Sequence, residues 1–116
     1  PFDWRSPQNN NLWQGVNGIN NPCPNGYRLP TEAELNAERL SWTSNDAAGA
    51  FASPLKLTVA GYRYYSSGLI LGVGTDGYYR SSNGLNSSKN LYFNNNLAKI
   101  DLNAKAYGFC VRCIKN

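Results

Sequence analysis

The amino-acid sequence predicts an α+β domain. One well-capped helix is expected early in the chain, and several short strand-like segments follow it at a spacing of about ten residues. Turn-forming residues, rather than further helices, separate these segments, so most neighbouring strands should be antiparallel. A single helix followed by a run of strands is typical of the α+β class.

The helix signal lies within residues 29–42. Thr31 can act as the N-cap with Glu34 three residues later, which is the pattern of a capping box, and Pro30 ends any helix before it. We expect the helix at about residues 32–41, with an apolar stripe of Ala33, Ala37 and Leu40 that Trp42 closes.

The strand signals follow in the second half of the chain. Residues 44–49 read as a loop, and the turn signals are 66–68, Asp76–Gly77 and Asn83–Gly84. The predicted strands are 60–65, 69–74, 78–82, 90–94 and 108–114.

Length and composition indicate one ordered domain. The chain has 116 residues, of which 41% are apolar and only 16% are charged, against about 25% charged in typical domains. No stretch approaches the roughly 18 consecutive apolar residues of a membrane span. No signal peptide is visible, and because the chain opens on Pro1 we read it as a fragment or trimmed domain.

The residue inventory argues against an enzyme and against cofactors. The chain has no His, which excludes Ser-His-Asp and Cys-His catalysis and His-ligated zinc. The sequence also lacks a calcium loop, a phosphate loop and a dinucleotide fingerprint. Residues 61–116 hold seven basic and two acidic groups, but these are spread singly, so we expect a solubilising surface and no nucleic-acid partner.

Composition changes along the chain. Residues 61–116 hold seven of the eight Tyr together with many Ser, Gly and Asn, which is the mixture found in antibody binding surfaces. The same residues are also common in strands and turns. Both interpretations stay open: a sheet with tight turns, and a binding surface built on it.

Three cysteines leave one without a partner. Cys110 and Cys113 would face opposite sides of a strand, and a tetrahedral zinc site lacks ligands. We favour a Cys23–Cys113 disulfide, which would indicate an extracellular setting. The alternative is three reduced thiols in a cytosolic protein.

Two segments resemble one protein family. Residues 21–34 read N-P-C-P-N-G-Y-R-L-P-T-E-A-E, and residues 106–115 read A-Y-G-F-C-V-R-C-I-K. Together with Tyr78-Tyr79-Arg80-Ser81-Ser82, they resemble the variable proteins of diversity-generating retroelements and the Fibrobacter-type major paralogous domains. The R-L-P-T-E-A-E part also recurs in formylglycine-generating-enzyme-like domains. Cys110 and Arg80 depart from the Ser and Trp usual in that family.

The resemblance implies a C-type-lectin-like fold in which residues 1–60 form a scaffold and residues 61–116 a diversified, ligand-binding half. It implies an extracellular, cell-surface or virion location, with display on an oligomer or phage particle and an unknown protein or surface ligand. The expected ligand-binding residues are Tyr64, Tyr65, Ile70, Leu71, Tyr78, Tyr79, Arg80, Tyr92, Asn94, Asn96 and Tyr107. The expected core is Trp13, Leu35, Leu40, Trp42, Leu91, Phe93, Phe109 and Val111.

Two alternatives belong to the same resemblance. One is a cell-surface structural or adhesion domain of this fold with a fixed surface. The other is a formylglycine-generating-type oxidase, which uses a cysteine pair with copper. That pair is spaced more widely than Cys110 and Cys113, and the sugar-binding motifs of calcium-dependent lectins are absent.

Overall fold

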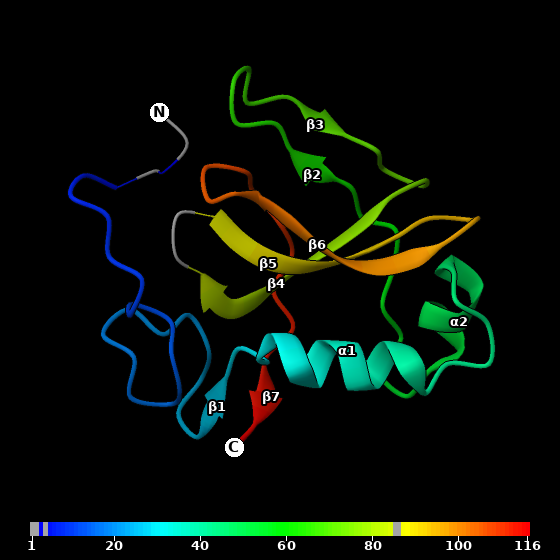
Figure 1. Ribbon diagram of the computed structural model, residues 1–116, viewed down its shortest axis with the longest axis horizontal. Helices are drawn as coiled ribbons and strands as arrows, with labels where there is room; N and C mark the ends of the chain where they lie inside the picture. Colours follow the sequence, from blue (N-terminus) through cyan, green and yellow to red (C-terminus); the bar gives the residue numbers. More distant parts are fainter. Residues whose placement is uncertain (1–2, 4, 85–86) are drawn as a thin grey trace.

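The chain forms an α+β fold of two helices and three small antiparallel sheets in the computed structural model, which describes residues 3, 5–84 and 87–116. The helices are α1 (Glu32–Leu40) and α2 (Ala47–Ala52). The strands are β1 (Tyr27–Arg28), β2 (Tyr62–Arg63), β3 (Ile70–Leu71), β4 (Gly77–Gly84), β5 (Ser87–Phe93), β6 (Ala98–Ala104) and β7 (Ile114–Lys115). In Figure 1 the central sheet lies between α1 on one side and the β2–β3 hairpin on the other.

The central sheet has the order β4-β5-β6. Tyr79 pairs with Leu91, and Leu91 pairs with Ile100, so these three side chains share the face that packs on α1. The expected turn at Asn83–Gly84 is wrong, because both residues belong to β4, in which Gly84 pairs with Ser88. Tyr78 and Arg80 point to the opposite face of the sheet.

Helix α1 confirms the predicted capping box. The Thr31 hydroxyl accepts a hydrogen bond from the backbone N–H of Glu34, and the Glu34 carboxylate accepts one from the backbone N–H of Thr31. The expected apolar stripe is wrong, however. Leu40 is 67% exposed while Leu35 is 2% exposed, because five residues turn a helix by about 140° and put the two on different faces.

Helix α2 replaces the end of the loop predicted at 44–49. Asp46 caps it by accepting from the Gly49 N–H at 3.0 Å, and the Ala47 N–H donates to the Asn94 carbonyl at 2.8 Å. Gly49 is required there, because a Cβ at this position would lie 1.8 Å from the Ser44 carbonyl oxygen. A short helix thus forms where contact with the β5–β6 turn supports it.

Strand β7, at the C-terminal end of the chain, forms an antiparallel pair with β1. Tyr27 lies opposite Lys115, and the predicted Cys23–Cys113 disulfide is confirmed next to this pair, with a Cα–Cα distance of 5.7 Å. The predicted strand at 108–114 is largely wrong. Only isolated bridges from Gly108 and Cys110, and then β7, form in this segment.

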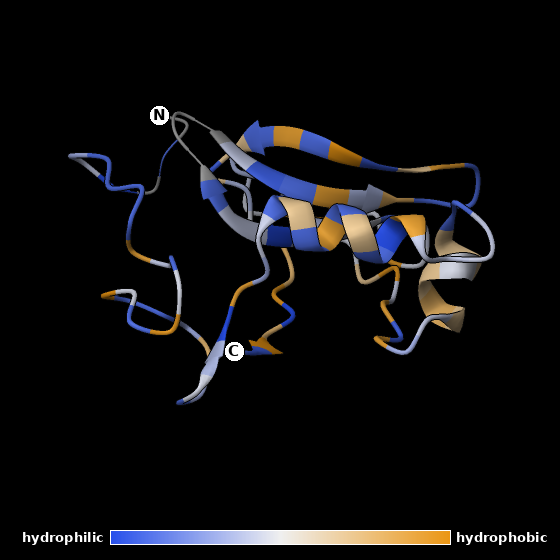
Figure 2. Cartoon of the chain, turned by 60° about the horizontal axis from the view of Figure 1, so that its bottom comes forward, coloured by the Kyte–Doolittle hydropathy of each residue, from blue (hydrophilic) through white to orange (hydrophobic). Residues whose placement is uncertain are grey.

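The predicted strands 60–65 and 69–74 shrink to the two-residue strands β2 and β3. Tyr64 closes the hairpin between them, since its N–H donates to the Leu69 carbonyl at 2.9 Å and its carbonyl accepts from the Gly68 N–H. Strand β6 was not expected. Its alternation of apolar and polar residues is visible in Figure 2.

The core lies between the helices and the central sheet. It contains Leu35, Ala50, Leu57, Tyr79, Leu91, Phe93 and Ala98, with Trp42 packed edge-on against Phe93 at 5.8 Å. Val111, expected in the core, is 37% exposed, and Trp13 and Phe109 lie outside this cluster. Among the described residues, no helix is long and apolar enough to cross a membrane.

Candidate functional site

Seven aromatic rings gather on the side of the central sheet away from α1. We call them the aromatic cluster. They come from β2, the hairpin, β4, β5 and the segment before β7, and they are Tyr62, Tyr64, Tyr65, Tyr78, Tyr92, Tyr107 and Phe109. Alternation along the strands places Tyr78 and Tyr92 here, because their neighbours Tyr79, Leu91 and Phe93 point into the core. All seven come from residues 61–116.

The rings form an unbroken series of contacts. Tyr78 packs on Tyr92 with ring centroids 4.6 Å apart and stacks on Phe109 at 4.7 Å. Phe109 stacks on Tyr107 at 5.4 Å, and Tyr107 meets Tyr65 at 5.0 Å. Such pairs contribute about 0.5–1.5 kcal/mol each beyond area burial, so the cluster holds its shape without a ligand.

Hydrogen bonds fix one edge of the cluster. The Tyr92 hydroxyl donates to the Asp76 carboxylate at 2.8 Å and accepts from the Asn94 side-chain amide at 2.9 Å. The Asn94 side-chain oxygen also accepts from the backbone N–H groups of Asn96 and Leu97, which shapes the β5–β6 turn. Asn94 therefore has a structural contact at every polar atom of its side chain.

Three phenols of the cluster, those of Tyr78, Tyr92 and Tyr107, have raised pKa values and stay neutral at physiological pH. Burial raises the pKa of Tyr78, and the charges of Asp76 and Asp101 add to this effect. Burial also raises the pKa of Tyr107 and of Tyr92, the latter with help from the hydrogen bond to Asp76. Tyr78, Tyr92 and Tyr107 thus present neutral hydroxyl groups that can donate and accept hydrogen bonds.

An exposed apolar strip borders the cluster. It runs along β3 and the following turn, and Leu69, Ile70, Leu71 and Val73 are 62%, 58%, 39% and 66% exposed. Between this strip and the cluster lies an open groove of about 240 Å³, lined by Tyr62, Ile70 and Phe109 among others. Aromatic rings, aliphatic side chains and a shallow groove therefore occur together on one side of the molecule.

The structure brings together most of the predicted binding residues. Tyr64, Tyr65, Tyr78, Tyr92 and Tyr107 meet in the cluster, of which Tyr65 is the most open at 36% exposed. Ile70 and Leu71 lie on the bordering strip, and Asn94 and Asn96 lie in the β5–β6 turn.

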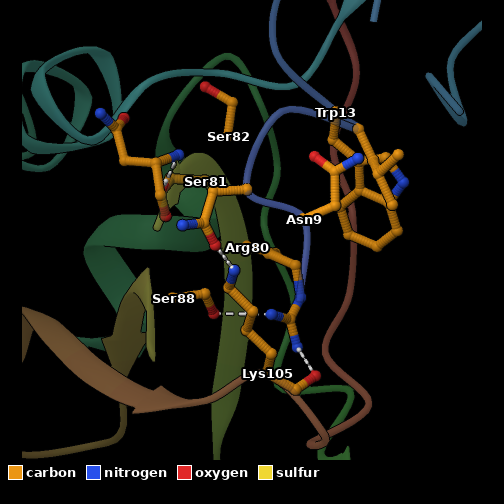
Figure 3. Close-up of a pocket in the computed structure, with 10 residues that line it drawn as sticks. Asn9, Trp13, Arg80, Ser81, Ser82, Ser88 and Lys105 are labelled. Atoms are coloured by element: carbon orange, nitrogen blue, oxygen red, sulfur yellow. Dashed lines mark hydrogen bonds between the residues drawn. The ribbon is translucent and has the colours of Figure 1, made fainter. Parts of the chain in front are cut away.

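Two predicted binding residues are buried instead. Tyr79 is 8% exposed, because it alternates with Tyr78 and stacks on Phe93 in the core, where its hydroxyl accepts from the Thr58 N–H at 3.0 Å. Arg80 is 5% exposed, because the segment at Tyr107 and Phe109 and the loop at Trp13 cover it (Figure 3). Neither side chain is open to a large ligand.

Tyr62 and Phe109 were not predicted as site residues. Tyr62 bridges Tyr78, Tyr107 and Phe109, with ring distances from 5.0 to 6.4 Å. Its spacing of two residues from Tyr64 was the available signal, because residues i and i+2 of a strand share a face. Phe109 depends on contacts across the sheet that sequence spacing does not encode.

Of the three cysteines, two form a disulfide and one is free. Cys113 is bonded to Cys23, which leaves Cys110 as a single half-buried thiol whose pKa is raised by burial. The part of the chain that the structure describes contains no group of three or more potential metal ligands.

Comparison of the chain with protein families, with curated proteins and with solved structures finds no match.

Proposed function

We propose that this domain is a ligand-binding module that recognises a protein or other surface ligand through residues 61–116 and performs no chemistry on it. The observation that carries the proposal is the aromatic cluster beside the exposed Leu69–Val73 strip. Tyrosines give large, stiff contact area at low entropic cost, and exposed apolar patches typically mark interaction sites.

The division of the chain supports a scaffold with a separate recognition surface. The capped helix α1, the β1–β7 pair and the Cys23–Cys113 disulfide hold residues 23–40 to the end of the chain. Leu91 and Phe93 anchor the central sheet from the opposite face. Side chains at the cluster and the strip can therefore differ without altering the core.

We further propose a C-type-lectin-like fold and an origin as a variable protein of a diversity-generating retroelement. The motifs at 21–34 and 106–115 support this, as does the pairing of β1 with β7, which brings these two motifs together. The disulfide is compatible with display on a cell surface or virion. Such proteins vary because template adenines are mutated, which turns Asn codons into Tyr, Ser, Asp and others.

Sequences of this locus from several isolates test the proposal. We expect substitutions confined to adenine-containing codons of residues 61–116, concentrated at exposed positions such as Tyr65, Ile70 and Asn96. The buried Leu91 and Phe93 serve as internal controls and should stay constant. A near-copy of the last coding segment in the neighbouring DNA, beside a reverse transcriptase gene, would also support the proposal.

Changes scattered evenly over both halves, mostly silent, would instead support the alternative of a cell-surface structural or adhesion domain with a fixed surface. The oxidase alternative requires two free thiols to bind copper. A copper titration in which the Cys23–Cys113 bond stays intact and Cys110 binds no metal would remove it.

A display experiment tests the surface directly. One library randomises Tyr64, Tyr65, Ile70 and Leu71, and a matched library randomises exposed positions on the helices, such as Leu40 and Phe51. Selection against a test protein should give folded binders from the first library at a much higher rate. Equal rates, or unfolded clones from the first library only, would contradict a tolerant recognition surface.

A further inference from the structure

A buried cation, Arg80 of β4, lies on the side of the central sheet away from α1. The Arg80 guanidinium donates to Ser88 Oγ at 2.6 Å through Nη1, and to the carbonyl oxygens of Tyr107 at 2.5 Å and Lys105 at 3.4 Å through Nη2. It also lies over the Phe109 ring, 5.0 Å from the centroid. A guanidinium has five N–H donors. Among the residues that the structure describes, these bonds use one on Nη1 and two on Nη2, so one on Nε and one on Nη1 remain.

A second cation stands beside it. Lys105 is 9% exposed, and among the described residues its ammonium group donates to Asn10 Oδ1 alone of three available donors. Within residues 3, 5–84 and 87–116 the ion pairs are Arg28–Glu34 and Lys89–Glu32, so neither Arg80 nor Lys105 has a carboxylate within 4 Å. Two buried positive charges thus face each other without a counter-charge at contact distance.

Both Arg80 and Lys105 have lowered pKa values, which reflect the cost of burying their positive charges. Burial lowers the pKa of Arg80 to about 10, and the more distant charge of Asp3 offsets this only in part. Burial also lowers the pKa of Lys105, and the positive charge of Arg80 adds to the effect. Buried charges are normally paired, so an anion between them would relieve both.

A small cavity opens between the two cations (Figure 3). Its volume is about 50 Å³, several times the roughly 10–15 Å³ that one water molecule needs. The cavity is too small for a sugar or a nucleoside. The other lining residues are mostly hydroxyl and amide side chains, among them Ser81, Ser82 and Asn83.

We propose that this cavity is a binding site for a single oxyanion group, phosphate or sulfate, held by Arg80 and Lys105. The remaining guanidinium N–H groups and an ammonium group can donate to the oxygens of a tetrahedral anion. The Ser88 hydroxyl, which accepts from Arg80, can donate to a further oxygen. The inference goes beyond the recognition surface of residues 61–116 and does not rest on it.

Titration of the ¹⁵N-labelled chain with inorganic phosphate, at constant ionic strength set with sodium chloride, tests the site. We expect saturable NMR shifts of the amides of Ser81, Ser82 and Asn83 and of the Trp13 indole. The Lys105→Gln variant should bind phosphate about tenfold more weakly, because one charge-assisted contact is lost. The Lys99→Gln variant removes the same charge at an exposed site near the other end of β6, and should bind like the parent.

Absence of saturable shifts, or equal weakening by Lys99→Gln and Lys105→Gln, would overturn the proposal. If Lys105→Gln does not fold, the parent titration decides alone. Shifts confined to the cavity support the site, while shifts shared with the exposed Lys56 and Lys115 overturn it. A parallel titration with O-phosphoserine separates the sources, since tighter binding than inorganic phosphate indicates a group carried by a larger molecule.

Discussion

Three consecutive residues of β4 have three different environments. Tyr78 belongs to the aromatic cluster, Tyr79 to the core, and Arg80 to the cationic cavity. Strand alternation alone predicts that the side chains of Tyr78 and Arg80 share a face, and that Tyr79 lies on the other. Which face is buried depends on where α1 packs, so the prediction from sequence put all three on one binding surface.

Replacing Tyr79 by Phe isolates its hydroxyl. The ring would keep its stack on Phe93, but the Thr58 N–H would lose its acceptor. We expect Tyr79→Phe to lower the free energy of unfolding by about 1 kcal/mol in urea titration. Tyr27→Phe, at an exposed ring, is the control and should change little, and an equal effect of both variants would contradict the buried role of Tyr79.

Glu34 makes stability depend on pH. Its hydrogen bonds to Arg28 lower the pKa of the carboxyl from the ordinary 4.5 to about 2, with help from Thr31. The carboxylate therefore stabilises the fold above pH 4.5, and this contribution disappears as pH falls from 4.5 towards 2. The pair is partly exposed, with side chains 19% and 39% accessible, so solvent screens it.

Glu34→Gln should therefore destabilise the domain at pH 7 by about 1 kcal/mol, mainly because the charge-assisted hydrogen bonds to Arg28 are lost, while Gln can still close the capping box. The loss should be smaller at pH 3. Urea titrations at both pH values measure the difference. Glu32→Gln in the same helical turn breaks only the surface pair with Lys89 and should have a smaller effect at either pH. A pH-independent loss in Glu34→Gln would contradict the assignment.

Secondary-structure elements that depend on neighbouring residues could be predicted from the sequence, whereas most of those that depend on contacts between distant residues could not. The capping box of Thr31 and Glu34 lies within four residues, so α1 could be predicted with its start. The six residues of α2 depend on the contact of Ala47 with Asn94, far along the chain. Strand β6 could have been predicted, because apolar and polar residues alternate along it in the sequence. The bridges of Gly108 and Cys110 could not, because they pair with residues far away in the chain.

The structure places Leu35, and not Leu40, on the buried face of α1, and two substitutions test this assignment. Leu35→Ala should destabilise the domain by about 2–4 kcal/mol, because it leaves a cavity against Leu91 and Phe93. Leu40→Ala, in the same helix but 67% exposed, should cost less than about 1 kcal/mol. Chemical denaturation followed by circular dichroism compares them, and similar losses would mean that Leu40 packs in the core.

For the whole molecule, composition predicted where the candidate site lies but not how it is built. The abundance of Tyr in residues 61–116 indicated the half of the chain that forms the aromatic cluster. Composition could not predict which rings touch between Tyr92 and Tyr65. Tyr107 and Phe109 join the cluster only because the segment after β6 folds back over the sheet. The cavity at Lys105 likewise needs the loop of Asn10, 95 residues away in sequence.

The disulfide stabilises the whole fold through the length of chain it closes. Cys23 and Cys113 are 90 residues apart, and the chain-entropy relation gives about 4 kcal/mol for such a loop. The double variant Cys23→Ser with Cys113→Ser should unfold at a correspondingly lower denaturant concentration and should not respond to reductant. Cys110→Ser is the matched control and should keep the stability and reductant sensitivity of the parent.

The β1–β7 pair also has a practical consequence for attachment. The Asn116 N–H donates to the Gly26 carbonyl at 3.0 Å, and Figure 1 places this end of the chain across the molecule from the β2–β3 hairpin. A biotin or fluorescent label coupled after Asn116 would emerge at that far pole. A sensor chip loaded in this orientation leaves the tyrosine side turned toward the flowing solution, where incoming molecules can reach it unhindered.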